Sequence, residues 1–168
     1  VQQIVEDETG LDAARCHDAT YMLYDEPDPA LASLLSNAGI PAADFQQTFM
    51  TGRLSKSWND EAATWYSYDA QGRTNWTAKE IQGLGLFTME YSYNFQGNLK
   101  EAVFNRHKPG EQVWYRYSYD RDGRLVRVEF RADEHDAWAE QAQYAYYLPG
   151  PLKRPELAED AQGLDFVY

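Results

Sequence analysis

A motif that recurs four times in the chain constrains its fold more than any other feature of the sequence. The motif reads Tyr-x-Tyr-Asp/Asn-x-x-Gly-x-Leu, and its glycines are 25 to 27 residues apart. Its residues, copy by copy, are Tyr66, Tyr68, Asp69 and Gly72; Tyr91, Tyr93, Asn94, Gly97 and Leu99; Tyr117, Tyr119, Asp120, Gly123 and Leu125; and, more weakly, Tyr144, Tyr146, Gly150 and Leu152. A partial copy, Gly52-Arg53-Leu54, precedes them. Such a period indicates a small structural unit that becomes stable by stacking against copies of itself.

Each position of the motif has a physical reason that favours a β-hairpin. Two tyrosines at i and i+2 point to the same face of a strand. The Asp or Asn that follows accepts backbone hydrogen bonds and starts a turn. The glycine supplies the positive φ that closes a short hairpin loop. The leucine two residues later then begins the return strand, a place that Thr74 takes once.

We therefore predict an all-β fold of consecutive antiparallel β-hairpin repeats that form a twisted or spiral sheet. A lone hairpin is only marginally stable in water, so neighbouring hairpins must pair with one another. The aromatic content of 15%, with 13 Tyr and 5 Trp, suits a sheet whose face is covered by stacked aromatic side chains. The repeats are expected over residues 51–168, as a fragment of a longer array. The segments 82–85 and 107–110 are expected to be turns that join one hairpin to the next.

Residues 1–50 do not repeat, and we interpret them as an insertion or an edge cover on the array. The segment 21–24 is compatible with a strand. The segment 28–39 is typical of a short helix, with Asp28 as the N-cap, Pro29 in the first turn and Gly39 at the C-terminal end. Leu31, Leu34 and Leu35 form one apolar stripe, which is expected to pack on the sheet.

The net charge and the composition limit the partners that the chain can have. A net charge of −12 repels phosphate backbones and anionic lipids, so neither nucleic acid nor a membrane surface is an expected partner. No apolar run approaches the roughly 20 residues of a membrane span. The one cysteine, Cys16, has no partner for an intrachain disulfide.

No catalytic, cofactor-binding or metal-binding residue is predicted, and the chain is not expected to be an enzyme. The sequence contains no Gly-x-Ser-x-Gly elbow and no phosphate-binding glycine loop. His17, His107 and His135 are expected on the surface, and Cys16 and His17 would face opposite ways on a strand. The acidic stretch around His135 lacks the spacing of a metal site and is interpreted as a solvated loop.

The repeated Tyr-x-Tyr-Asp-x-x-Gly-Arg-Leu motif resembles the Rhs, or YD, repeat of bacterial proteins. The resemblance covers residues 51–168 and is closest at 117–125 and 66–73. It implies a large secreted or surface-exposed bacterial protein whose repeats wind into a hollow β-shell. Such shells commonly enclose a toxic C-terminal domain, and one component of insecticidal toxin complexes belongs to this family. The partners implied are the neighbouring repeats of the same parent chain and an enclosed toxin domain.

Family members can also cleave themselves near an Asp-Pro-x-Gly-Leu element. The stretch Asp160-Ala161-Gln162-Gly163-Leu164 resembles that element, but Ala161 replaces the proline. We interpret the stretch as another repeat turn.

An alternative function is an aromatic-rich surface module that binds carbohydrate or a protein partner. The tryptophans that could stack on sugar rings are Trp58, Trp65, Trp76, Trp114 and Trp138. They hold no constant place in the repeat, whereas a repeated ligand pocket should repeat its aromatic anchor. The pattern therefore favours packing of these side chains over ligand binding.

Overall fold

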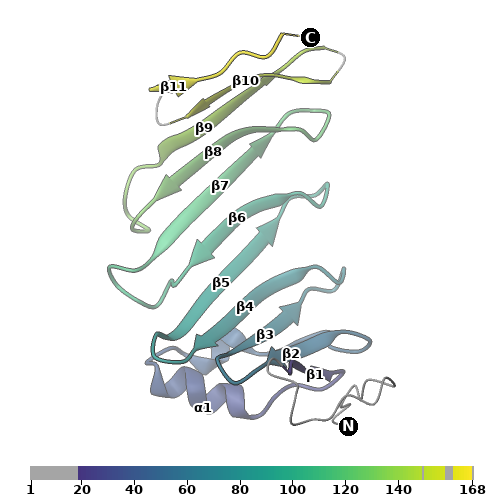
Figure 1. The fold of residues 1–168 in the computed structure, drawn as a ribbon, viewed down its shortest axis with the longest axis vertical. Helices are drawn as coiled ribbons and strands as arrows, with labels where there is room; N and C mark the ends of the chain where they lie inside the picture. The colour runs from purple at the N-terminus through teal and green to yellow at the C-terminus, as the bar shows by residue number, and fades with distance from the viewer. Residues whose placement is uncertain (1–18, 149, 158–160, 168) are drawn as a thin grey trace. The chain divides into compact units, whose positions relative to one another are not determined.

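The computed structural model describes residues 19–148, 150–157 and 161–167 (Figure 1). The chain divides into two compact units, Val1–Met89 and Glu90–Tyr168. The described residues of the first unit form β1 (Tyr21–Tyr24), α1 (Ala30–Asn37), η2 (Ala42–Phe45), β2 (Leu54–Trp58), β3 (Ala62–Tyr68) and β4 (Thr74–Ile81). The second unit contains β6 (Leu99–Phe104), β7 (Val113–Tyr119), β8 (Leu125–Arg131), β9 (Ala139–Tyr146), β10 (Leu152–Leu157) and β11 (Gln162–Gly163). The strand β5 (Gly85–Tyr93) runs from the first unit into the second.

Within each unit, strands that follow one another in the chain are neighbours in the sheet and run antiparallel. This holds from β1 to β4 and again from β6 to β11. The all-β class and the consecutive antiparallel hairpins predicted from the motif are therefore confirmed.

The motif glycines lie at the bends between paired strands. Gly72 lies between β3 and β4, Gly123 between β7 and β8, and Gly150 between β9 and β10. All three have positive φ, of 81°, 78° and 118° respectively. Gly97, between β5 and β6, has a φ of 90°. The residue two positions after each glycine begins the return strand, as the motif predicts.

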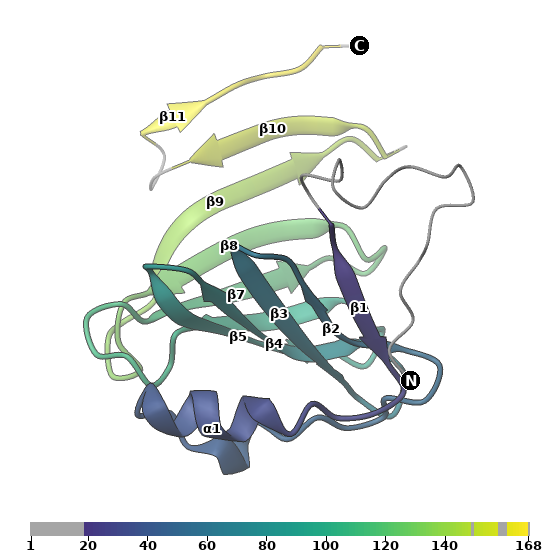
Figure 2. The same cartoon turned by 60° about the horizontal axis from the view of Figure 1, so that its bottom comes forward.

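The expected helix forms, and it covers one face of the sheet in the first unit (Figure 2). The helix α1 begins at Ala30, with Pro29 in the N-cap position, one residue later than predicted. The carboxylate of Asp28 nevertheless accepts a hydrogen bond from the backbone N–H of Ala30 at 3.0 Å, as a capping residue does. Gly39 follows the helix with a φ of 73°, as expected for a glycine at this position.

The apolar stripe of α1 packs on the sheet. Leu31 and Leu35 are buried, and Leu34 packs against the same core from a half-buried position. The other buried residues of this core are Ile40, Phe45, Trp65, Trp76, Ala78 and Leu86. The ring of Phe45 meets that of Trp76 edge-on, with centroids 5.4 Å apart.

The strand register separates two faces of the sheet in the first unit. Trp65 pairs with Ala78 and Ser67 pairs with Trp76, so these four residues share the face that α1 covers. Tyr66 pairs with Thr77 and therefore points to the opposite face. Hence the first tyrosine of the motif lies on the side of the sheet away from the helix.

The corresponding alternation in the second unit gives a charged face. Arg116 on β7 pairs with Glu129 on β8, and its guanidinium donates two hydrogen bonds to that carboxylate, at 2.9 and 2.8 Å. Arg127 on β8 forms an ion pair with Glu140 on β9 at 3.0 Å. These pairs let this face remain in contact with water, whereas the tryptophan-rich face of the first unit needs a cover.

Candidate functional site

The motif loops share one backbone geometry. In the β3–β4 loop, Asp69 N–H donates to the carbonyl of Arg73 at 2.8 Å, and Gly72 N–H donates to the carbonyl of Asp69 at 2.9 Å. The β7–β8 loop repeats both bonds, from Asp120 to Arg124 at 3.0 Å and from Gly123 to Asp120 at 3.1 Å. The loops that contain Gly97 and Gly150 form the same pair of bonds. A turn followed by one residue with positive φ is a common three-residue hairpin connection.

The acidic residue of the motif holds the loop together through its side chain. In Asp120, Oδ1 accepts hydrogen bonds from the N–H groups of Asp122 and Arg124, each at 2.9 Å. Oδ2 of the same carboxylate accepts a bond from Arg124 Nε at 2.7 Å. Asn94 forms the corresponding backbone bonds to Gln96 and Asn98, at 3.0 and 2.9 Å. In these three loops Asp or Asn supplies an acceptor oxygen for the backbone N–H groups. The fourth loop has Tyr147 at this place and keeps the two backbone bonds.

These bonds lower the pKa of the loop carboxylates. At Asp120 the backbone N–H of Arg124 contributes most to the lowered pKa, and the Arg124 side chain adds to it. At Asp69 burial alone would raise the pKa, but the hydrogen bonds from Arg73 and Gln71 outweigh it, so the pKa falls below its usual value. Both carboxylates are therefore held in the charged form by the loop that they close.

The second tyrosine of the motif connects one hairpin to the hairpin before it. The hydroxyl of Tyr119 donates to the backbone carbonyl of Leu99 at 2.8 Å, and that of Tyr146 donates to Leu125 at 2.8 Å. In the first unit, the Tyr68 hydroxyl donates to Leu54 at 2.9 Å. In every case the acceptor is the residue that begins the preceding return strand. We call this hydrogen bond the tyrosine clasp.

In two of these three clasps, an arginine just before that leucine also lies over the tyrosine ring. The Arg124 guanidinium lies over the Tyr146 ring at 4.8 Å, and the Arg53 guanidinium lies over the Tyr68 ring at 5.5 Å. Arg53 also lies against the next loop, since a Cβ added to Gly72 would be 2.6 Å from its Nη2. The sequence motif includes this Gly-Arg-Leu arginine, but nothing in the sequence shows that it contacts the next repeat.

Burial raises the pKa of the clasp tyrosines. Desolvation is the largest cause at Tyr68, Tyr119 and Tyr146. It is also the largest cause at Tyr117, the first tyrosine of its motif. These phenols remain neutral donors at physiological pH, which the clasp requires.

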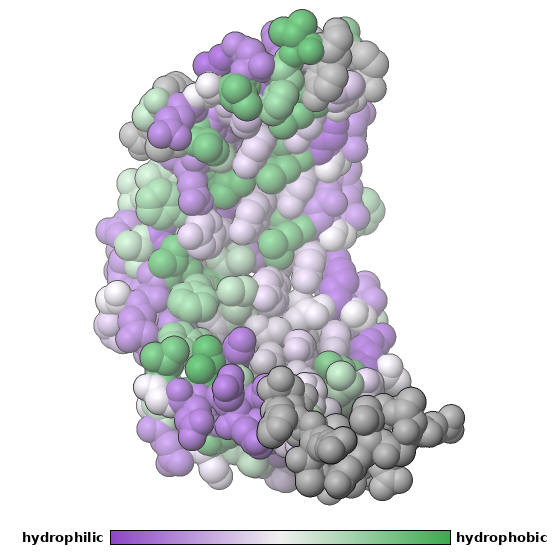
Figure 3. Space-filling view, viewed as in Figure 1, coloured by the Kyte–Doolittle hydropathy of each residue, from purple (hydrophilic) through white to green (hydrophobic). Residues whose placement is uncertain are grey.

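The first tyrosines of the four copies, Tyr66, Tyr91, Tyr117 and Tyr144, are all half-buried. The hydroxyl of Tyr66 lies 3.3 Å from Ser57 Oγ. Three of the five tryptophans, Trp65, Trp76 and Trp114, are buried. On the face drawn in Figure 3, apolar residues are interspersed with polar ones. The placement of these three tryptophans agrees with the expectation that they pack in the core.

Trp138 is half-buried, and two arginines of neighbouring strands lie against its ring. The guanidinium groups of Arg116 and Arg131 lie 4.4 and 4.6 Å from the centre of its ring. A ring that two side chains of the same protein already contact is less free to stack on a sugar. This contact serves packing of the charged face.

The described residues contain no cluster of side chains that could hold a metal ion. No three His, Cys, Asp or Glu side chains there are close enough to share a metal ion. His135 is exposed as expected, but His107 is half-buried, which the sequence did not predict. Cys16, His17 and Asp160 lie outside the described residues.

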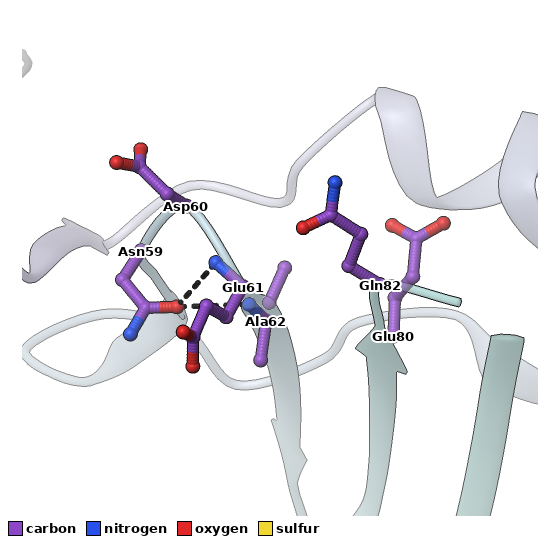
Figure 4. A pocket seen from close by; sticks show the side chains of 7 residues that line it. Asn59, Asp60, Glu61, Ala62, Glu80 and Gln82 are labelled. Carbon is purple, nitrogen blue, oxygen red and sulfur yellow. Dashed lines mark hydrogen bonds between the residues drawn. The ribbon is translucent and has the colours of Figure 1, made fainter. Parts of the chain in front are cut away.

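A shallow pocket of about 280 Å³ in the first unit contains three carboxylates (Figure 4). Asp60 points away from Glu80 and Gln82, and the three acidic side chains do not converge. Asn59 Oδ1 accepts hydrogen bonds from Glu61 and Ala62 N–H groups, at 3.0 and 2.8 Å, and so closes the turn between β2 and β3. The pocket is therefore the outer surface of a turn.

No protein-family model and no curated protein matches the chain. Among solved structures, a TcdB2-TccC3-Cdc42 crystal structure superimposes with a TM-score of 0.59 and 12% identity, over 84% of this chain and 7% of the other. A TcdB2-TccC3-TEV structure gives 0.52 and 16%, over 83% and 7%. The chain shares the fold of a segment of these toxin-complex proteins. A Tc holotoxin pore of Photorhabdus luminescens also matches, with a TM-score of 0.53, 16% identity and the same 83% and 7%.

The chain thus spans a small part of the structures that it resembles. Toxin complexes were one of the settings implied by the repeat motif. The likeness concerns the β fold, and the identity of the motif as a YD repeat is taken up below. In the part of the chain that the structure describes, no helix is both long and apolar enough to cross a membrane.

Proposed function

We propose that the chain is a structural repeat segment of a large secreted or surface Rhs-type protein. Its YD-type hairpins would build part of a β-shell that encloses or displays a toxin or effector domain. The tyrosine clasp supports this function best, because it joins successive hairpins through the most regular residues of the motif. The fold shared with toxin-complex structures adds independent support.

The geometry explains how such a segment serves as a wall. The β3–β4, β7–β8 and β9–β10 hairpins each contribute their backbone pairing, one clasp hydroxyl and one closed loop, and none of these depends on a ligand. Stability then adds up from unit to unit, as in other repeat proteins. The half-buried tyrosines and the paired charges of the described strands suit a wall with solvent on one side.

Protease protection in the complete parent protein tests this function. We expect its C-terminal domain to resist digestion while the hairpin array is intact, and to be digested when the array is unfolded with denaturant. The gene should encode further Tyr-x-Tyr-Asp-x-x-Gly copies next to this segment. A C-terminal domain that is digested equally fast in both states, in a protein without further copies, would contradict the proposal.

Binding of carbohydrate has less support. Three of the five tryptophans are buried, and two arginines lie against the ring of a fourth. A glycan array with bacterial cell-wall sugars tests this alternative directly. We expect no binding; a sugar whose binding is lost in a W58A variant would favour the carbohydrate-binding function instead.

A further inference from the structure

The hairpin β1–β2 has the geometry of a motif hairpin, although its sequence shows only the Gly52-Arg53-Leu54 part of the motif as a continuous stretch. In the β3–β4 and β7–β8 pairs, the register shifts immediately before the second tyrosine, at Tyr68 and Tyr119. In the β1–β2 pair it shifts immediately before Tyr24. Tyr24 pairs with Leu54, as Tyr119 pairs with Leu125. Tyr24 therefore occupies the place of the second tyrosine in a fifth hairpin.

The loop of this hairpin is closed in the same way. The N–H of Asp25 donates to the carbonyl of Arg53 at 3.1 Å, as Asp69 and its counterparts do in the other loops. Gly52 has a φ of 72°, close to the 81° of Gly72. Its N–H donates to Asp25 Oδ1 at 2.5 Å. Residues 26–51, which contain α1, thus stand where the other loops have two residues between the acidic residue and the glycine.

The clasp of this fifth hairpin is incomplete. The other three clasp hydroxyls each donate to a carbonyl of a preceding return strand, but the Tyr24 hydroxyl donates to the thioether of Met22 at 3.2 Å. A thioether is a weak acceptor. Tyr24 is also 42% exposed, whereas Tyr68, Tyr119 and Tyr146 are half-buried.

The loop that contains Gly52, next to Tyr24, also has free space beside it. A Cβ added to Gly72 would meet Arg53, and one added to Gly123 would lie 3.7 Å from Asn98, each a side chain from the preceding hairpin. A Cβ added to Gly52 would meet no atom within 4 Å in the described structure. A Cβ added to Gly150 would also meet no atom within 4 Å in the described structure. In that hairpin, however, Arg124 lies over the Tyr146 ring and the Tyr146 hydroxyl donates to Leu125.

We propose that β1, Tyr24 and the Gly52 loop form a docking edge for the return strand of another motif hairpin. The occupant is a strand that begins with Gly-Arg-Leu or a close variant. Its leucine carbonyl accepts the Tyr24 hydroxyl, and its arginine lies over the Tyr24 ring beside the exposed carboxylates of Asp25 and Glu26. This rests on the proposed function, and it names the partner that the array takes at this edge.

Three observations select this occupant over another apolar partner. Tyr68, Tyr119 and Tyr146 each make this contact, and each makes it with a strand of this kind. An edge strand offers a row of backbone groups that another strand can pair with. The acidic side chains at the loop suit the arginine of a Gly-Arg-Leu strand.

The experiment appends a copy of residues 113–131, which contains Arg124 and Leu125, to the N-terminus of the complete chain. Residues 1–18 then serve as the linker. The Y24F substitution is introduced into the appended chain and into the original chain, with Y119F as the matched control. Urea unfolding gives the folding equilibrium constant, and hydrogen exchange measures protection of the backbone amides of β1.

We expect the appended hairpin to protect the β1 amides from exchange. Y24F should lower the folding constant about five-fold in the appended chain. It should leave the constant of the original chain within about two-fold, because there the hydroxyl meets only Met22. Y119F should lower the constant by a similar factor in both chains.

Two results would overturn the docking edge. The β1 amides could be protected while Y24F leaves the folding constant of the appended chain unchanged. In that case a strand pairs with β1 without the Tyr24 hydrogen bond, and the role given to Tyr24 is wrong. If the amides are not protected, the edge does not dock a motif hairpin. Neither result depends on protection of the C-terminal domain in the parent protein, which tests the proposed function separately.

Discussion

The clasp hydroxyl explains why the second aromatic residue of the motif is tyrosine. Phenylalanine would fill the same space, but it has no donor for the carbonyl of the preceding strand. That carbonyl belongs to the first residue of the return strand, and at Leu54 and Leu125 a register shift disturbs regular backbone pairing there. The hydroxyl thus satisfies an acceptor that the irregular ladder leaves available.

Replacing a clasp tyrosine with phenylalanine tests this role. We expect Y119F and Y146F each to lower the free energy of unfolding by about 1 kcal/mol, the usual net value of such a hydrogen bond. Urea unfolding measures the change. The control is Y21F, because Tyr21 stacks on Trp58 through its ring, with centroids 5.6 Å apart. Equal stability of Y119F and the unchanged protein would show that the clasp contributes nothing.

The loop carboxylates make stability depend on acid. The pKa of Asp69 is lower in the folded protein than in the unfolded chain, so its contribution is present above about pH 4 and is lost as pH falls through the folded pKa. A D69N variant keeps a side-chain oxygen that accepts hydrogen bonds from the backbone N–H groups of the loop, as Asn94 does naturally. Its amide cannot titrate. Its melting temperature should therefore fall less steeply than that of the unchanged protein below about pH 4. Parallel curves for the two proteins would rule out a contribution from Asp69.

The loop glycines differ in how closely the preceding hairpin approaches them. Both Gly72 and Gly123 have positive φ, so alanine at either position costs about 1–2 kcal/mol of backbone strain. At Gly72 the added methyl group must also displace Arg53 from its place over Tyr68. We expect G72A to be less stable than G123A in thermal unfolding. The opposite order would mean that Arg53 moves aside at no cost.

At the scale of elements, a half-buried polar network holds the helical block, residues 28–47, to the strands of the first unit. Asp28 accepts hydrogen bonds from Trp65 Nε1 at 2.8 Å and from Ala30 N–H, and it forms an ion pair with Lys56 at 2.9 Å. Gln47 extends the network, because its Nε2 donates to the carbonyls of Ser55 and Tyr66, each at 2.8 Å. The block is therefore attached by directional bonds as well as by apolar packing.

Removal of the Asp28 carboxylate should loosen this block. D28A leaves the Trp65 donor and the Lys56 charge without their acceptor, and we expect a loss of about 2 kcal/mol in stability. The tryptophan fluorescence should shift to longer wavelength as water reaches Trp65. D60A is the control, since Asp60 is exposed and points away from its neighbours. Unchanged fluorescence in D28A would show that packing alone holds the helix.

The sequence predicted those elements whose signals are local. The motif glycines marked the bends, the residues two positions later marked the return strands, and Asp28, Pro29 and Gly39 marked the helix within one residue. The fifth hairpin was not recognised, because residues 26–51 separate Tyr24 and Asp25 from Gly52 in the chain. The clasp acceptors were not predictable either. A backbone carbonyl is present at every residue, and only the register of two paired hairpins selects the one that a hydroxyl reaches.

At the scale of the whole molecule, the strand register does not depend on loop length. The β1–β2 pair keeps the register of a motif hairpin with all of residues 26–51 in its loop. A flexible Gly/Ser segment of about ten residues between Arg121 and Asp122 should therefore leave the β7–β8 pairing intact, at a cost of about 1–2 kcal/mol for loop closure and lost loop bonds. The same segment between Ser118 and Tyr119 should unfold the second unit. Circular dichroism and hydrogen exchange of β8 distinguish the two, and equal damage by both insertions would contradict this expectation.

A helix carried on the bend of a hairpin has a consequence for how such proteins diversify. New sequence can enter at the tip of a repeat while the strands on either side keep their partners, so the sheet and the inserted segments can change at different rates. Each bend is a separate site at which a segment can be inserted. Residues 26–51 show that such a segment can fold back onto the sheet and contribute to the core.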